Sequence, residues 1–169
     1  MVMAGAITLA ALAGPSFSTL IEANEARTAA RRVERELQTA RLKAVTASRA
    51  LRVRFDCPAA GQLRILEVTG IATTDDAANR CDPVAFPSPG PNDMLRATPS
   101  LDSPVIYLPE GTTVTGDPRH FEFSTRGSVH EVDGSGATVD VAGDVVLTIT
   151  RDGWSYTVTI NALGRIKLD

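Results

Sequence analysis

Apolar and polar residues follow two different rhythms along this chain, and the change falls near residue 50. Between residue 16 and about residue 50, apolar positions recur at alternating spacings of four and three, which predicts an amphipathic helix. This apolar stripe consists of Ala26, Ala30, Val33, Leu37, Ala40, Ala44 and Ala47. From Leu51 the period becomes two, which predicts β-strands. The sequence therefore predicts an α+β fold, with a long N-terminal helix followed by an antiparallel β-sheet or sandwich domain.

The strands of the second half are expected in short alternating runs. These runs cover residues 51–57, 63–68, 105–108, 112–115, 120–124, 128–132, 138–141, 145–150 and 156–160. Residues 133–136 (Asp-Gly-Ser-Gly) and 151–153 (Arg-Asp-Gly) predict turns. Residues 69–103 are rich in Pro, Asp and Asn, and this composition predicts irregular structure at the surface.

The first residues form a short apolar run. Met1 to Ala13 is strongly apolar, and the first charged residue is Glu22. The run is shorter than the roughly 20 residues that span a bilayer, and no basic residue precedes it as in a secretory signal. We expect it to be the end of a longer apolar helix, so that the mature protein begins upstream. The alternative is the buried N-terminal helix of a soluble protein, although the sequence contains no similarly hydrophobic helix to cover it.

Charge divides the chain in the same way as hydrophobicity. Residues 1–54 carry nine basic and four acidic side chains, whereas residues 55–169 carry eight basic and sixteen acidic ones. The helix owes its positive charge to residues between the stripe positions, namely Arg27, Arg31, Arg32, Arg35, Arg41 and Lys43. We expect this cluster to be the solvated face of the helix. The alternative is contact with anionic lipid headgroups or a neighbouring subunit, since the cluster follows the apolar run.

Residues suited to catalysis or metal binding are few, and the sequence predicts neither an enzyme nor a cofactor. His120 and His130 lie on separate expected strands without a metal-ligand spacing, and Cys57 and Cys81 lack a CxxC arrangement. Two such cysteines are independent thiols in a cytosolic protein and usually pair in an exported one. Three loop carboxylates, Asp75, Asp76 and Asp82, could bind Ca²⁺, but without the ordered spacing of a calcium loop we expect a solvated loop. An enzyme or toxin with a secreted β-domain would need a convergent pair of titratable residues.

Several segments in a fixed order resemble the GspH and FimT group of minor pseudopilins and type IV minor pilins. They are Gly14-Pro15-Ser16-Phe17, the following Ser18–Asn24, the Ala- and Arg-rich helix, Phe121–Gly127, and Thr157–Ile166 with its Gly-Arg ending. Each segment is weak alone, but their order and spacing are specific, and they span nearly the whole chain. One departure is that the cleavage motif of the family is absent before the apolar run. Aligning Pro15 with the usual proline of pilin spines implies about seven further residues, which would bring the run to the roughly 20 that span a bilayer.

The resemblance implies a division of the chain into an incomplete membrane anchor at 1–21, an amphipathic spine helix at 22–50 and a periplasmic β-domain at 51–169. It implies a single-pass protein of the bacterial inner membrane. In the oxidising periplasm, Cys57 and Cys81 are expected to form a disulfide that fastens the Pro-rich loop to the first strand. The glutamate that pilins use during assembly cannot be assigned to a residue here.

The resemblance also implies two functions. The first is a minor pseudopilin of a type II secretion system, at or near the filament tip, that contacts other pseudopilins, the inner-membrane assembly platform and exported cargo. Its helix stripe (Ala26, Ala30, Val33, Leu37, Ala40 and Ala44) is expected to pack against other subunits, although a sheet of the same chain would also suit it.

The alternative function is a FimT-like minor pilin that binds DNA in natural transformation or supports pilus assembly. Its contacts would be Arg165 and Lys167, which alternate with Ile166 and Leu168 and so share one face of a strand. The net charge of −8 on residues 55–169 opposes DNA binding, which depends on a positive field. The same two residues are also what the polar face of an edge strand would carry.

Overall fold

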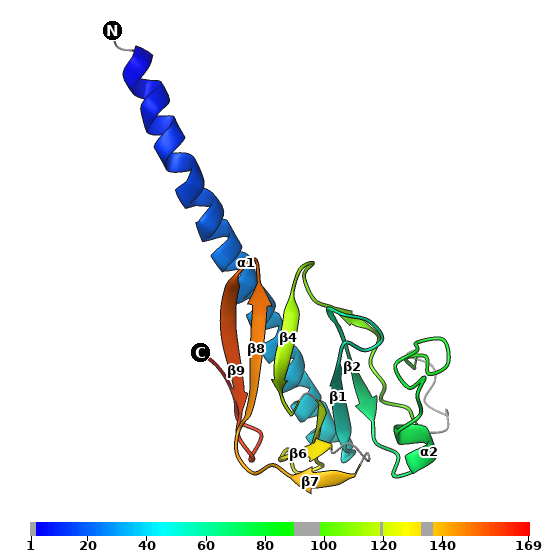
Figure 1. Cartoon of the computed structure of the whole chain (residues 1–169). Coiled ribbons are helices and arrows are strands. Elements are labelled where there is room, and N and C mark those ends of the chain that lie inside the picture. Colours follow the sequence, from blue (N-terminus) through cyan, green and yellow to red (C-terminus); the bar gives the residue numbers. More distant parts are fainter. Residues whose placement is uncertain (1–2, 90–98, 119, 133–136) are drawn as a thin grey trace.

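One long helix and a two-sheet β-domain make up the molecule. The computed structural model describes residues 3–89, 99–118, 120–132 and 137–169 (Figure 1). The turn predicted at 133–136 lies outside these residues. The N-terminal part of the helix projects beyond the sheets, and its C-terminal part lies across them (Figure 1). This arrangement confirms the predicted α+β fold.

Helix α1 spans Met3–Ala47. The apolar helical run expected before Pro15 and the amphipathic helix predicted from Ser16 form one continuous helix, which passes through Pro15. A proline inside a helix removes one backbone hydrogen bond, and here that loss does not end the helix. Ser48 has a φ of 52°, the left-handed conformation that often follows the last helical turn. Among the described residues, no helix contains a stretch both long enough and apolar enough to cross a membrane.

Within the described residues, ten strands form two antiparallel sheets. The first sheet has the order β3-β2-β1-β5-β6-β7, and the second has the order β10-β9-β8-β4. The strands of the first sheet are β1 Leu51–Phe55, β2 Gln62–Glu67, β3 Ile106–Tyr107, β5 His120–Phe123, β6 Val129–Val132 and β7 Thr138–Asp140. Those of the second are β4 Thr113–Asp117, β8 Val145–Arg151, β9 Trp154–Ile160 and β10 Ile166–Leu168.

The hairpin between β8 and β9 turns where the sequence predicted. Arg151 pairs with Trp154, which leaves Asp152 and Gly153 as a two-residue turn. Their φ angles are 51° and 81°. Two left-handed residues match the twist of antiparallel strands, and Asp-Gly is a preferred sequence for this turn.

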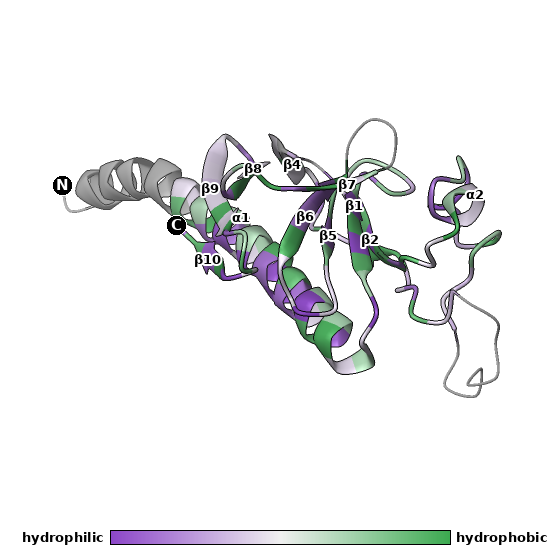
Figure 2. Ribbon diagram, turned by 90° about the horizontal axis from the view of Figure 1, so that it is seen from below, coloured by the Kyte–Doolittle hydropathy of each residue, from purple (hydrophilic) through white to green (hydrophobic). Residues whose placement is uncertain are grey.

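The core forms where α1 crosses the inner faces of both sheets. The helix contacts β8, β9 and β10 of one sheet and β1 and β5 of the other. Hydrophobic and hydrophilic bands alternate along its described part (Figure 2). Ala29 joins the buried stripe, whereas Ala47, its predicted last member, is exposed because the helix ends there. The inner faces contribute large side chains, among them Leu51, Val53, Phe121, Phe123, Leu147, Ile149, Val158 and Ile160.

The segment between β2 and β3 differs from its prediction. It contains a four-residue helix, α2 (Ala72–Asp75). Four polar residues of this segment, Asp75, Arg80, Asp102 and Ser103, are buried rather than at the surface. Strand β2 is buried on both faces, because this segment folds over the face turned away from α1. The prediction of irregular surface structure was therefore wrong for these parts of 69–103.

Candidate functional site

The predicted subunit-packing stripe lies inside the chain's own core. Its six members, Ala26, Ala30, Val33, Leu37, Ala40 and Ala44, are between 0% and 1% exposed. Small alanine side chains let the sheets approach the helix closely, so no surface of the stripe is left for a neighbour. The expectation that these residues contact other subunits is corrected, and the alternative of a sheet from the same chain is what the structure has.

Any contact that another molecule makes with α1 would therefore use its other faces, and one of these is strongly basic. Arg27, Arg31 and Arg35 are spaced four residues apart, which places them on one side of the helix, and all three are exposed. Arg32 is exposed beside them. Within the described part of the chain, no carboxylate forms an ion pair with these four side chains. This arginine face is free to meet an acidic surface.

A second surface is a groove of about 480 Å³ at the C-terminal end of α1. It is lined by Gln38, Arg41, Leu42, Val45, Arg126, Gly164, Arg165 and Ile166. Leu42 is 65% exposed and Val45 is 42% exposed, so two apolar side chains lie side by side at the surface here. The groove therefore combines apolar area with three arginines.

Close backbone packing builds the wall of this groove. Arg41 donates from Nε to the carbonyl of Gly127 (3.1 Å) and from Nη2 to the carbonyl of Leu163 (3.3 Å). Gly164 has a φ of +77°, and a Cβ there would lie 1.9 Å from the Gly127 carbonyl oxygen. Only glycine permits this approach, which holds the end of the chain against the β5–β6 turn.

The two residues predicted for DNA binding are both exposed and have different neighbours. Arg165 lines the groove, whereas Lys167 lies on β10 and pairs with Asp169. Arg165 instead shares the groove with Arg41 and Arg126, which the sequence analysis did not bring to this site. The spacing of Gln38, Arg41, Leu42 and Val45 at i, i+3, i+4 and i+7 was a signal for a second mixed face of the helix.

The three carboxylates considered for Ca²⁺ are engaged in different contacts. Asp75 is buried and accepts hydrogen bonds from the backbone nitrogens of Thr69 and Gly70, at 2.8–3.1 Å. Asp76 pairs with Arg52 at 2.7 Å. Asp82 accepts a hydrogen bond from the nitrogen of Val84 at 2.8 Å. In the described residues, no three potential ligands cluster as a metal site would require.

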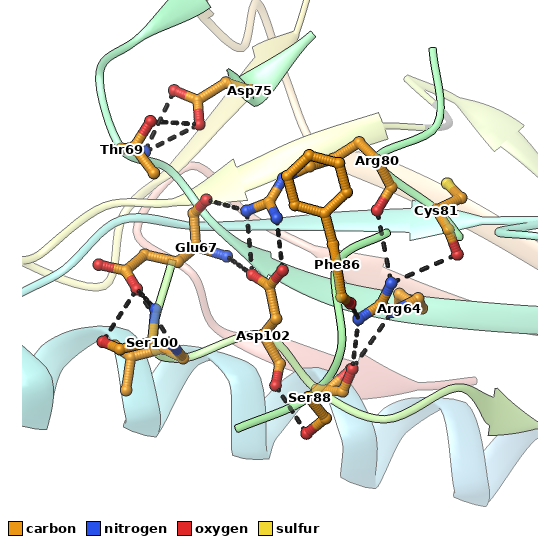
Figure 3. A network of polar contacts seen from close by, with 12 residues as sticks. Arg64, Glu67, Thr69, Asp75, Arg80, Cys81, Phe86, Ser88, Ser100 and Asp102 are labelled. Carbon is orange, nitrogen blue, oxygen red and sulfur yellow. Dashed lines mark hydrogen bonds and ion pairs between the residues drawn. The ribbon is translucent and has the colours of Figure 1, made fainter. Parts of the chain in front are cut away.

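A buried polar network lies beneath the loop that contains these carboxylates (Figure 3). Arg80 is 1% exposed and donates hydrogen bonds from both terminal nitrogens to the Asp102 carboxylate, at 2.5 and 3.0 Å. Its Nη2 also donates to the carbonyl of Glu67, and its guanidinium lies 4.7 Å from the centre of the Phe86 ring. Asp102 in turn accepts from the Glu67 nitrogen at 2.8 Å.

A second arginine of this network, Arg64, is 0% exposed. Its guanidinium donates to four backbone carbonyls, those of Ser103, Arg80, Cys81 and Phe86. Burial lowers the pKa of Arg64 from its ordinary value, and the nearby positive charge of Arg80 acts in the same direction. This side chain fastens carbonyls from both ends of the loop to β2, so it organises structure.

The outer face of the first sheet carries a further charged pair. Arg52 contacts Glu122 at 2.6 Å and Asp76 at 2.7 Å. Burial disfavours the charged form of Arg52 and lowers its pKa. The hydrogen bonds and negative charges of Asp76 and Glu122 have a larger combined effect, so the pKa of Arg52 rises. Burial lowers the pKa of the neighbouring Arg54, as does the charge of Arg52. The rise at Arg52 therefore reflects ion pairing, whereas the fall at Arg54 reflects burial.

The cysteines form a disulfide in the structure. Cys57 follows β1 and Cys81 belongs to the loop, 24 positions later, with their Cα atoms 5.1 Å apart. The bond therefore fastens the loop to the first strand, beside the polar network that Arg64 and Arg80 form.

The histidines lie on neighbouring strands, His120 on β5 and His130 on β6. His130 stands between Asp140, 3.0 Å from Nδ1, and Ser128, 3.1 Å from Nε2. Serine hydrolases use the same order of carboxylate, imidazole and hydroxyl. Here the Asp140 side chain is 94% exposed, and the Ser128 hydroxyl also contacts Ser124 at 2.7 Å. The group therefore forms an ordinary polar chain on the sheet surface.

These features define a class of protein. A single long helix contributes one half to the core of an antiparallel β-domain and projects the other half beyond it, which is the architecture of a pilin-like subunit (Figure 1). The family profile described as "Type II transport protein GspH" matches residues 29–164. The chain therefore belongs to the GspH family, which groups minor pseudopilins with type IV minor pilins.

The chain is similar to solved structures, of which the first described here supports the fold. A crystal structure of the type IV minor pilin FimU of Pseudomonas aeruginosa matches with a TM-score of 0.53 and 19% identity, covering 89% of this chain and 92% of that one. The minor pseudopilin EpsH of the type 2 secretion system of Vibrio cholerae matches with a TM-score of 0.49 and 16% identity, covering 86% and 96%. A search of curated protein sequences found no significant match.

Proposed function

We propose that this chain is a minor pseudopilin of a type II secretion system, a structural subunit that helps to start or cap the periplasmic pseudopilus. It acts through contacts rather than catalysis. In this proposal the N-terminal segment anchors the chain in the inner membrane and the β-domain lies in the periplasm, where an oxidising environment maintains the Cys57–Cys81 disulfide. Its partners are other pseudopilins, the assembly platform and exported cargo.

One observation carries the proposal. The N-terminal part of α1 projects from the β-domain, and its last apolar residues, Leu20 and Ile21, are 67% and 57% exposed. The chain's own sheets cover only the stripe in the second half of the helix. The projecting part therefore needs other molecules to bury its apolar surface, first lipid and then the spines of neighbouring subunits.

The test is deletion of the gene in its host, complemented by variants and scored in parallel for released proteins and for uptake of added DNA. Deletion should abolish release and leave uptake unchanged. Leu20→Arg should fail to restore release, whereas Val84→Arg, a matched change at a position 86% exposed, should restore it. Normal release from the deletion strain would refute the proposal.

The second candidate function is DNA binding by a minor pilin. It is favoured by the groove in which Arg165 meets Arg41 and Arg126, since three arginines can neutralise phosphates. The net charge of −8 on residues 55–169 acts against it. Loss of uptake on deletion, with normal release, would favour this function. The variant Arg165→Gln should then lower both the DNA affinity and its dependence on salt.

A further inference from the structure

The tip of the β8–β9 hairpin lies where α1 leaves the β-domain (Figure 1). Two contacts fix this position. Arg151 Nη2 lies 2.6 Å from Glu25 Oε2, and the Tyr156 hydroxyl donates to the carbonyl of Ala23 at 3.4 Å. The tip is therefore held beside the helix within one turn of the exposed Ile21.

Trp154, the only tryptophan of the chain, faces this part of the helix. Alternate residues of a strand share one face, and on β9 the buried Val158 and Ile160 and the helix-bonded Tyr156 define the face toward α1. Trp154 is the next member of this series, about 7 Å beyond Tyr156 along the strand. It remains 43% exposed, because at this level the helix alone stands opposite.

The residues around Trp154 appear in the order found where a helix leaves a bilayer. Exposed Leu20 and Ile21 come first along α1, the contacts of Tyr156 and Arg151 place the hairpin tip at about their level, and exposed Arg27 follows about 9 Å further down the helix. Tryptophan prefers the membrane–water interface because one part of its ring system is apolar and its N–H is a donor. Arginine near the headgroups is attracted by anionic lipid.

We propose that the hairpin tip, through Trp154, inserts into the headgroup region of the membrane that holds the N-terminal segment, and so fixes the β-domain against the bilayer before the subunit joins a filament. This inference rests on the proposed membrane anchoring. Lipid is the expected occupant because apolar side chains, tryptophan and arginine succeed one another along one end of the molecule, and because this series continues the apolar run of residues 1–13.

The single tryptophan makes the inference directly measurable. The full-length chain is reconstituted in vesicles of neutral and anionic phospholipid, with bromine placed on the acyl chains either near the headgroups or near the bilayer centre. The emission of Trp154 should shift to shorter wavelength, and the shallow bromine should reduce its intensity more than the deep bromine does.

A matched variant moves the probe to the other end of the β-domain. In Trp154→Phe/Val139→Trp the sole tryptophan replaces a residue of similar exposure, 41%, on β7. This tryptophan should show neither the shift nor the quenching. Equal quenching of both proteins would overturn the inference, because it would mean that the β-domain lies on lipid without a preferred orientation.

Flotation of the same vesicles tests the membrane anchoring of the chain separately from the insertion of the hairpin tip. If the protein floats with the vesicles but Trp154 is not quenched, the anchor stands and the hairpin inference fails. If the protein does not float, the proposed anchoring has failed and the inference fails with it. Quenching that is absent in vesicles, with a shift that appears only when other pseudopilins are added, would assign the tip to a protein neighbour instead.

Discussion

Breaking the buried pair between Arg80 and Asp102 should unfold the loop more readily than any surface change. The two side chains are 1% and 2% exposed and share two hydrogen bonds. Arg80→Met leaves the Asp102 carboxylate buried with the Glu67 nitrogen as its remaining donor in this network. Asp102→Asn leaves a buried guanidinium without its counter-charge. Either change leaves the remaining charge buried without the opposite charge that stabilised it.

The magnitude follows from this loss of compensation. Removing one partner of a buried ion pair typically costs about 3–5 kcal/mol of unfolding free energy, and about 1 kcal/mol corresponds to 2–4 °C in Tm for a chain of this size. Each single variant should therefore melt roughly 6–20 °C lower. The double variant Arg80→Met/Asp102→Asn removes both charges of the pair and should lose only about 1–3 kcal/mol, chiefly because the hydrogen bond to the Glu67 carbonyl is gone.

The assay is urea denaturation of the full-length chain in mild detergent, followed by far-UV circular dichroism for wild type, both single variants and the double variant. Lys167→Met serves as the control, because its pair with Asp169 is exposed and should contribute less than about 1 kcal/mol. The reasoning is refuted if each single variant loses less than about 1 kcal/mol, or if the loss in the double variant equals the sum of the two single losses.

Three further changes test the packing. Leu37→Ala should cost about 2–5 kcal/mol, measured in the same urea titration, because Leu37 is 1% exposed between helix and sheets; a cost below 1 kcal/mol would contradict the burial. Gly164→Ala should destabilise more than an ordinary loop substitution and loosen the groove, since its Cβ would lie 1.9 Å from the Gly127 carbonyl oxygen; unchanged melting would contradict this close approach. Replacing Cys57 and Cys81 together by serine should cost about 3 kcal/mol and make the loop the first site of limited proteolysis. If the variant shows neither effect, the polar network alone is enough to hold the loop.

Periodicity predicted the elements whose faces are set by local sequence. The alternation in Leu51–Phe55 and in Val145–Arg151 places apolar side chains on one face, and both segments are strands of the core. The helix stripe was read correctly except at its end, where Ala47 is exposed. The helical segments expected on either side of Pro15 are one helix, because a single proline can be accommodated inside a long helix.

The buried arginines could not be predicted in the same way. Arg64 occupies a polar position of an alternating strand, which normally faces water. It is buried because a segment that returns through Phe86 and Ser103 lies over it and offers carbonyls as acceptors. Every residue has the same backbone carbonyl, so these acceptors cannot be recognised from the sequence. The abundance of Pro, Asp and Asn in this segment gave no sign of the buried residues Asp75, Arg80, Asp102 and Ser103.

The stripe shows the same limit and leads to a conclusion about assembly. A row of alanines predicts a close partner but does not say whether the partner is the same chain or another. Here the chain's own sheets cover it, so substitutions in the stripe should act on folding. Contacts with neighbouring subunits must then use surfaces that the sheets do not cover. These surfaces include the projecting Leu20 and Ile21, the arginine face and the groove around Arg165. Substitutions at those sites should alter assembly while leaving the unfolding free energy nearly unchanged, because exposed side chains contribute little to folding.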